Sequence, residues 1–241
     1  MAATVVLMMT LAAALRQSTG LRPSLASLST QNAGQQQEIT ERHNDLRRSV
    51  NPSARNMLRM EWNPTAAENA RRWAQQCTLN HSPREKRTID GKVCGENLFM
   101  STAPTSWSEA IQAWFDEVKY FKYGYGSVTG EETGHYTQVV WYRSYQLGCA
   151  IAHCPWSKFA YYYVCHYCPG GNIVGSISTP YKTGRPCEDC PNACDNKLCT
   201  NPCKHNNIYS NCPDLARSHG CDHPDVKEWC KASCQCKTEI I

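Results

Sequence analysis

Cysteine is the residue type whose number and spacing carry the most chemistry in this chain. The 241 residues include 16 cysteines, six of them spread from Cys77 to Cys168 and ten crowded between Cys187 and Cys236. An even number of thiols at this density is typical of a disulfide framework formed in an oxidising compartment. The spacing from Cys187 to Cys194 would also suit zinc ligands, but the surrounding thiols favour disulfides. We therefore predict a secreted, extracellular protein in which every cysteine is bridged.

A nucleophilic site is the next chemistry to consider. Ser82 directly follows His81, and serine, histidine and a carboxylate are the parts of a catalytic triad. The sequence has no G-x-S-x-G elbow and no H-E-x-x-H helix, and adjacent side chains do not face each other on regular backbone. We predict that the chain is not an enzyme, and we keep a metal-dependent hydrolase as the last of three hypotheses.

Three helices are expected to position the N-terminal half. The apolar residues from Ile39 to Val50 share one helical face, which also carries His43. A second helix should begin with Asn63 as its N-cap and Pro64 at its first position. The third has a capping box, Ser106 to Glu109, followed by apolar residues at helical spacing, which are Ala110, Ala113, Trp114 and Phe121.

One carboxylate, that of Glu117, falls on the apolar face of the third predicted helix. Burying a polar group without a hydrogen-bond partner destabilises a fold by roughly 2–7 kcal/mol, and an ionised carboxylate costs more. A carboxylate in apolar surroundings must therefore have a partner. The sequence therefore predicts a cationic or metal neighbour for Glu117.

Strands are expected after the helices. Runs rich in β-forming residues cover 135–141, 147–152 and 159–166. Helices followed by a mainly antiparallel sheet predict an α+β domain. The cysteine-dense segment that follows is too short to form a core without its disulfides.

The N-terminus reads as a secretory leader. Residues 5–15 are apolar over the length of a signal-peptide core, and small residues follow at 18–20, so we predict a signal peptide over 1–20. Residues 21–37 are rich in Ser, Gln and Thr and are predicted to be a flexible leader. The formal net charge is +4, without the dense Lys/Arg clusters that nucleic-acid binding needs. We predict no nucleic-acid partner, no membrane insertion and a monomer.

Three motifs carry a resemblance to a known family. They are Gly134-His-Tyr-Thr-Gln-Val-Val-Trp141, Tyr161-Tyr-Tyr-Val-Cys-His-Tyr-Cys168 and Cys94-Gly-Glu-Asn-Leu-Phe99. They are similar to the signatures of the CAP superfamily, and the ten-cysteine tail narrows the resemblance to cysteine-rich secretory proteins. Stretches such as Arg87-Thr-Ile-Asp-Gly91 and the end Thr238-Glu-Ile-Ile241 look closest to helothermine-like lizard venom toxins.

The resemblance implies a fold and a division of the chain. A pathogenesis-related-1-like α-β-α sandwich, the CAP domain, is expected over 38–180. A disulfide hinge is expected over 181–202, and a channel-toxin-like domain that resembles the helical anemone potassium-channel toxins is expected over 203–241.

The resemblance also implies a cleft that contains two histidines and two glutamates, at His81, Glu96, Glu117 and His135. Imidazoles suit zinc or copper, and carboxylates can ligate the metal, orient the histidines or move protons. We expect that no cofactor is required and that this cleft is able to bind zinc or another divalent metal. His43 matches no cleft position and is interpreted as a histidine at the edge of the core.

The same resemblance implies the cysteine pairing. The pairs are Cys77–Cys154, Cys94–Cys168 and Cys149–Cys165 in the CAP domain, Cys187–Cys194 and Cys190–Cys199 in the hinge, and Cys203–Cys236, Cys212–Cys230 and Cys221–Cys234 in the tail.

Two further functional hypotheses follow from the family. The first is a toxin that blocks or modulates calcium, potassium or ryanodine-receptor channels through its tail, where Tyr209, Lys227 and Trp229 are the candidate contacts. Alternatively, Trp229 packs against the disulfides and Lys227 is solvated. The second is a non-toxin secretory protein that acts through zinc-linked or sterol binding in the CAP cleft, in reproduction or defence.

Overall fold

The computed structural model of the chain describes residues 23–241, and the predicted signal peptide lies outside them. The α-helices of the first domain are α1 (Ala33–Arg48), α2 (Pro64–Ala74), α3 (Trp107–Phe115) and α4 (Gly134–Val139). Its short 3-10 helices are η1 (Arg84–Arg87) and η2 (Asp116–Tyr120). Its strands are β1 (Glu61–Trp62), β2 (Thr88–Ile89), β3 (Lys92–Val93), β4 (Gly95–Ser101), β5 (Phe121–Lys122), β6 (Gly126–Ser127), β7 (Gln146–His153) and β8 (Tyr161–Cys168).

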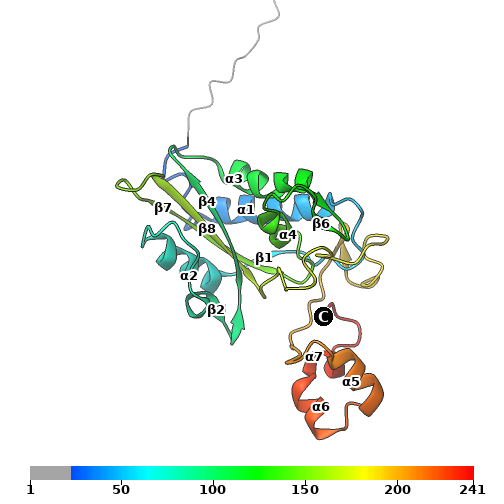
Figure 1. Cartoon of the computed structure of the whole chain (residues 1–241). Helices are drawn as coiled ribbons and strands as arrows, with labels where there is room; N and C mark the ends of the chain where they lie inside the picture. Colours follow the sequence, from blue (N-terminus) through cyan, green and yellow to red (C-terminus); the bar gives the residue numbers. More distant parts are fainter. Residues whose placement is uncertain (1–22) are drawn as a thin grey trace, which may run out of the picture.

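The first domain is an α-β-α sandwich. Its central sheet has the order β1-β7-β8-β4, in which β4, β8 and β7 are antiparallel and β1 is parallel to β7. Helices α1, α3 and α4 cover one face of the sheet and α2 covers the other (Figure 1). No helix within residues 23–241 is long and apolar enough to cross a membrane.

The approach of α2 to the sheet depends on Gly148 of β7. A Cβ atom at this position would lie 2.1 Å from the backbone nitrogen of Ala67, so only glycine lets the helix lie directly on the strand. On the opposite face, Trp107 of α3 is fully buried, and its indole nitrogen donates to the carbonyl of Leu28 at 2.9 Å.

The predicted helix starts at Asn63 and Ser106 are confirmed. The Asn63 side chain accepts from the backbone nitrogen of Ala66, and the Ser106–Glu109 capping box is complete. Of the apolar residues expected on α3, Ala110 and Trp114 are buried but Ala113 is exposed. The α-helix ends at Phe115, so Glu117 lies on η2 and Phe121 on β5 instead of on one continuous helical face.

Two expectations about local structure are wrong. The segment 21–37 is not a flexible leader from residue 23 onward, because Leu28 is buried in the core and α1 begins at Ala33, capped by Asn32. The run 135–141 is not a strand, and its first five residues belong to α4. The backbone nitrogens of His135 and Tyr136 donate to Glu117, a contact that sequence periodicity does not reveal.

A second histidine, His43, is fully buried on α1 instead of lying at the edge of the core. Its Nδ1 lies 2.8 Å from the carbonyl oxygen of Ile39 and its Nε2 lies 2.9 Å from the hydroxyl of Tyr167. Burial lowers the pKa of His43 to about 4, which keeps the ring neutral at physiological pH.

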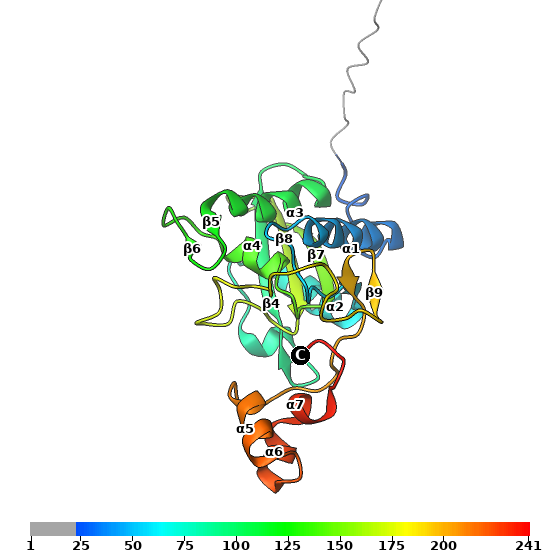
Figure 2. The same cartoon turned by 90° about the vertical axis from the view of Figure 1, so that its right-hand side faces the viewer.

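The C-terminal part is a small helical module reached through a hairpin. The hairpin strands are β9 (Cys194–Asp195) and β10 (Leu198–Cys199), and the helices are α5 (Cys212–His219), α6 (Pro224–Trp229) and α7 (Lys231–Gln235). The helices lie together below the first domain in both views, and the chain end returns to the junction (Figures 1 and 2). Ile240 is buried with Leu58 and Tyr145, and the Tyr142 hydroxyl donates to the carbonyl of Ile241 at 2.7 Å.

Arg47 joins α1 to the loops around the sheet. Its guanidinium is 1% exposed and donates to the carbonyls of Leu58, Val139, Trp141 and Tyr142 at 2.7–3.1 Å. The carbonyls of Trp141 and Tyr142 also accept from the backbone nitrogens of Ser144 and Leu58, whereas those of Leu58 and Val139 depend on the Arg47 guanidinium for a donor.

We expect Arg47→Met to lower the free energy of unfolding by about 3 kcal/mol or more, because it leaves buried carbonyls without donors. The matched control is Arg72→Met, which removes a guanidinium that is 70% exposed and paired with Glu68. That change should cost less than about 1 kcal/mol. Urea denaturation of both variants measures the difference, and equal losses would contradict the role assigned to Arg47.

Candidate functional site

Glu117 organises one side of the cleft. Its Oε1 accepts from Nδ1 of His135 at 2.6 Å, and its Oε2 accepts from the backbone nitrogens of His135 and Tyr136, both at 3.0 Å. The carboxylate therefore caps α4 and orients the imidazole at the same time. Burial would lower the pKa of His135, but the hydrogen bond and charge of Glu117, together with the charge of Glu132, raise it.

Glu96 plays the matching part on the other side of the cleft. Its Oε1 accepts from Nδ1 of His81 at 2.7 Å and from the backbone nitrogen of Ser82 at 2.8 Å, and its Oε2 accepts from the Ser82 hydroxyl at 2.6 Å. The hydroxyl of Ser82 is thus directed at a carboxylate and not at the imidazole of His81, unlike the serine of a catalytic triad.

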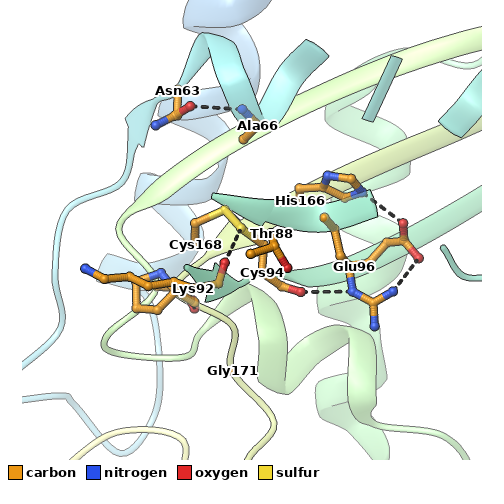
Figure 3. The surroundings of a disulfide bond; sticks show 12 residues. Asn63, Ala66, Thr88, Lys92, Cys94, Glu96, His166, Cys168 and Gly171 are labelled. Atoms are coloured by element: carbon orange, nitrogen blue, oxygen red, sulfur yellow. Dashed lines mark hydrogen bonds and ion pairs between the residues drawn. A yellow bond between two sulfur atoms is a disulfide. The ribbon is translucent and has the colours of Figure 1, made fainter. Parts of the chain in front are cut away.

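A third histidine, His166, also contacts Glu96. It lies opposite Glu96 in the β4–β8 register, is fully buried, and its Nε2 lies 2.9 Å from Glu96 Oε2 (Figure 3). Burial would raise the pKa of Glu96, but the hydrogen bonds from His166, His81 and Ser82 hold it below its usual range. Sequence reasoning did not single out His166, although a histidine inside the apolar run 159–166 was a signal for it.

The four predicted cleft residues lie in one region, where the glutamates accept hydrogen bonds and the histidines donate to them. His81, Glu96 and His135 line one cavity of about 290 Å³, and Glu117 holds His135 from beside it. Because an ionised carboxylate only accepts, the Nδ1 atoms of both histidines carry the protons and their Nε2 atoms have free lone pairs. Both oxygens of each glutamate are already occupied by donors. The glutamates therefore orient imidazoles that can bind a metal.

The thiols form no metal site. Within residues 23–241, Cys187, Cys190 and Cys199 are the one group of three potential ligands whose atoms lie within 4.8 Å of one another, and all three are in disulfides. All 16 cysteines are bridged, in the same eight pairs that the family resemblance implies. One of them, Cys94–Cys168, joins β8 to the segment just before β4, close to Glu96 (Figure 3).

The helical module presents an apolar corner. Trp229 is half-buried and packs with the disulfide-bonded Cys212 and Cys230, while Lys227 is exposed. The ring of Tyr209 meets that of Trp229 edge to face at 5.4 Å, and Tyr209 is 49% exposed. Ile208, which sequence reasoning did not consider, is 64% exposed, and its backbone nitrogen donates to the Trp229 carbonyl at 2.7 Å. We call Ile208 and Tyr209 the apolar corner.

Comparison with known proteins gives a consistent assignment. Residues 40–167 match the family described as "Cysteine-rich secretory protein family" (CAP), and residues 187–241 match the family described as "Crisp". The cysteine-rich venom protein helothermine of Heloderma horridum horridum is 60% identical over 233 residues, which cover 95% of this chain and 96% of that protein.

Solved structures agree with this assignment. The crystal structure of NaASP2 with Zn2+ matches with a TM-score of 0.59 and 32% identity, covering 70% of this chain and 96% of that one. The hookworm platelet inhibitor matches with a TM-score of 0.56 and 26% identity, covering 72% of this chain and 94% of that one. The chain therefore belongs to the cysteine-rich secretory protein family, with a CAP domain followed by a disulfide-rich Crisp module.

Proposed function

We propose that this protein is a secreted venom-type toxin that binds an ion channel at the cell surface through its C-terminal module. The observation that carries the proposal is the apolar corner, in which Ile208 and Tyr209 stand exposed on a module fixed by three disulfides. The similarity to a venom protein over nearly the whole chain supports the toxin role, and the bridged cysteines support secretion.

The composition of the module favours occlusion by an aromatic side chain over a lysine plug. Residues 187–241 carry six Lys and Arg against eight Asp and Glu, a net charge of −2. Lys227 is exposed but lies beside Glu228, whereas Tyr209 is held against Trp229. A side chain that is already ordered loses little conformational entropy on binding, which favours Tyr209 as the contact.

The proposed targets are calcium or potassium channels with extracellular mouths, and release channels of the ryanodine-receptor type come second. A secreted protein reaches the first group directly. Release channels in internal membranes are accessible only after the cell membrane is crossed.

We expect Tyr209→Ala to weaken block by about 2 kcal/mol, roughly thirtyfold in Kd, if Tyr209 is an interface hot spot. The matched control is Tyr125→Ala, which removes an exposed tyrosine of the CAP domain. Lys227→Ala should have a smaller effect than Tyr209→Ala, and a double variant His81→Ala/His135→Ala should still block. Patch-clamp recording on a panel of surface calcium and potassium channels measures these differences. Absence of block by the wild-type protein on every channel would overturn the proposal.

A second candidate function is metal-linked binding in the CAP cleft. The observation that favours it is the orientation of His81 and His135, each held through Nδ1 by a carboxylate so that Nε2 is free. This carboxylate–histidine arrangement suits zinc. When bound there, zinc would supply a coordination position for a group of a partner molecule. A related structure determined with Zn2+ is consistent with such a site.

We expect the wild-type protein to bind Zn²⁺, and His135→Ala to abolish that binding. Glu117→Gln should weaken binding by roughly 10–100-fold, because it disturbs the orientation of His135 without removing a ligand. His153→Ala is the control, since His153 is an exposed histidine on β7 outside the cleft. Competition with a chromophoric chelator measures the affinities, and equal affinities for all variants would place the metal elsewhere.

A further inference from the structure

The histidine cleft lacks donors for a well-held divalent metal. Zinc sites in proteins use three or four protein ligands, and here the two Nε2 atoms of His81 and His135 are the free imidazole donors. Glu96 accepts two hydrogen bonds on each oxygen, and Glu117 accepts one on Oε1 and two on Oε2, so both carboxylates are largely committed to holding the histidines and the backbone around them.

A third carboxylate, that of Glu132, lines the same cavity as His81 and His135. Glu132 lies just before α4, is exposed, and its side chain makes no hydrogen bond or ion pair with any residue in 23–241. The neighbouring Glu131 does not line the cavity.

The two amides that line the cavity make hydrogen bonds of their own, Asn97 through its nitrogen and Asn172 through both its oxygen and its nitrogen. Asn97 donates to the carbonyl of His135 at 3.0 Å, and Asn172 accepts from Thr137 and donates to the carbonyl of Gly134, both at 2.7 Å. Among the side chains of this cavity, Glu132 therefore has the one carboxylate without a hydrogen-bond partner within the described chain.

We propose that Glu132 supplies a carboxylate ligand to a divalent metal held by His81 and His135. This inference rests on the proposed metal binding in the cleft. The ligand atoms of the three residues do not all lie within 4.8 Å of one another, so ligation requires their side chains to move closer together when metal binds. For Glu132, this movement breaks no side-chain hydrogen bond or ion pair with any residue in 23–241. The resulting set of two histidines and one carboxylate leaves a coordination position open for a further ligand.

The test compares Glu132→Gln with Glu131→Gln in the full-length protein, because the two changes remove the same charge one residue apart. Chelator competition with Zn²⁺ should show at least about tenfold weaker binding for Glu132→Gln and unchanged binding for Glu131→Gln. The visible absorption spectrum of the Co²⁺-loaded protein gives a second readout, since it changes when a ligand is lost and not when a distant charge is removed.

The outcomes separate the two proposals. Weaker Zn²⁺ binding together with a changed Co²⁺ spectrum for Glu132→Gln supports ligation. Unchanged affinity, or weaker affinity with an unchanged spectrum, overturns it while leaving the histidine site in place. Absence of Zn²⁺ binding by the wild-type protein overturns both the metal-linked function and the role of Glu132.

Discussion

The arrangement of the CAP cleft depends on two carboxylates that must have both oxygens satisfied. Glu117 accepts hydrogen bonds from two backbone nitrogens at the start of α4 and from Nδ1 of His135. Glu96 accepts hydrogen bonds from His81, from the backbone and hydroxyl of Ser82, and from His166. The same bonds therefore start a helix, fix a loop and set the tautomer of two imidazoles. Carboxylates committed in this way orient the histidines, and Glu132 is the proposed further ligand of a bound metal.

The second constraint is covalent. Besides its cysteines, the module after the hinge buries Val226 and Ala232 and parts of Leu215, Ala216 and Trp229. Its three disulfides replace the core that so short a segment cannot build. Its last residues return to the CAP domain, where Ile240 packs beside Tyr145 and Arg143 donates to Asn206 at 2.7 Å. The apolar corner is thereby presented by a module that is rigid within itself and fastened to a larger body, which lowers the entropy that binding would cost.

Local signals in the sequence predicted what is locally determined. Asn63 and the Ser106–Glu109 box mark helix starts because their caps lie within three residues, and the strands β7 and β8 follow from their own β-rich runs. Contacts distant in sequence were not predictable in this way. Helix α4 reads as a strand because its cap, Glu117, lies 18 residues before it, and the segment around Leu28 reads as a leader because its partner is Trp107. The cleft residues were predictable from the family motifs. Glu132 and Ile208 were not, because only the fold shows that one lines the cavity and the other is exposed.

The most direct test of the orienting role of Glu96 and Glu117 is a crystal structure of the protein loaded with Zn²⁺. The arrangement described here predicts that the metal is bound by Nε2 of His81 and His135, while the Nδ1 atoms remain hydrogen-bonded to Glu96 and Glu117. Coordination of the metal by Glu96 or Glu117, with loss of the hydrogen bond to its histidine, would contradict it.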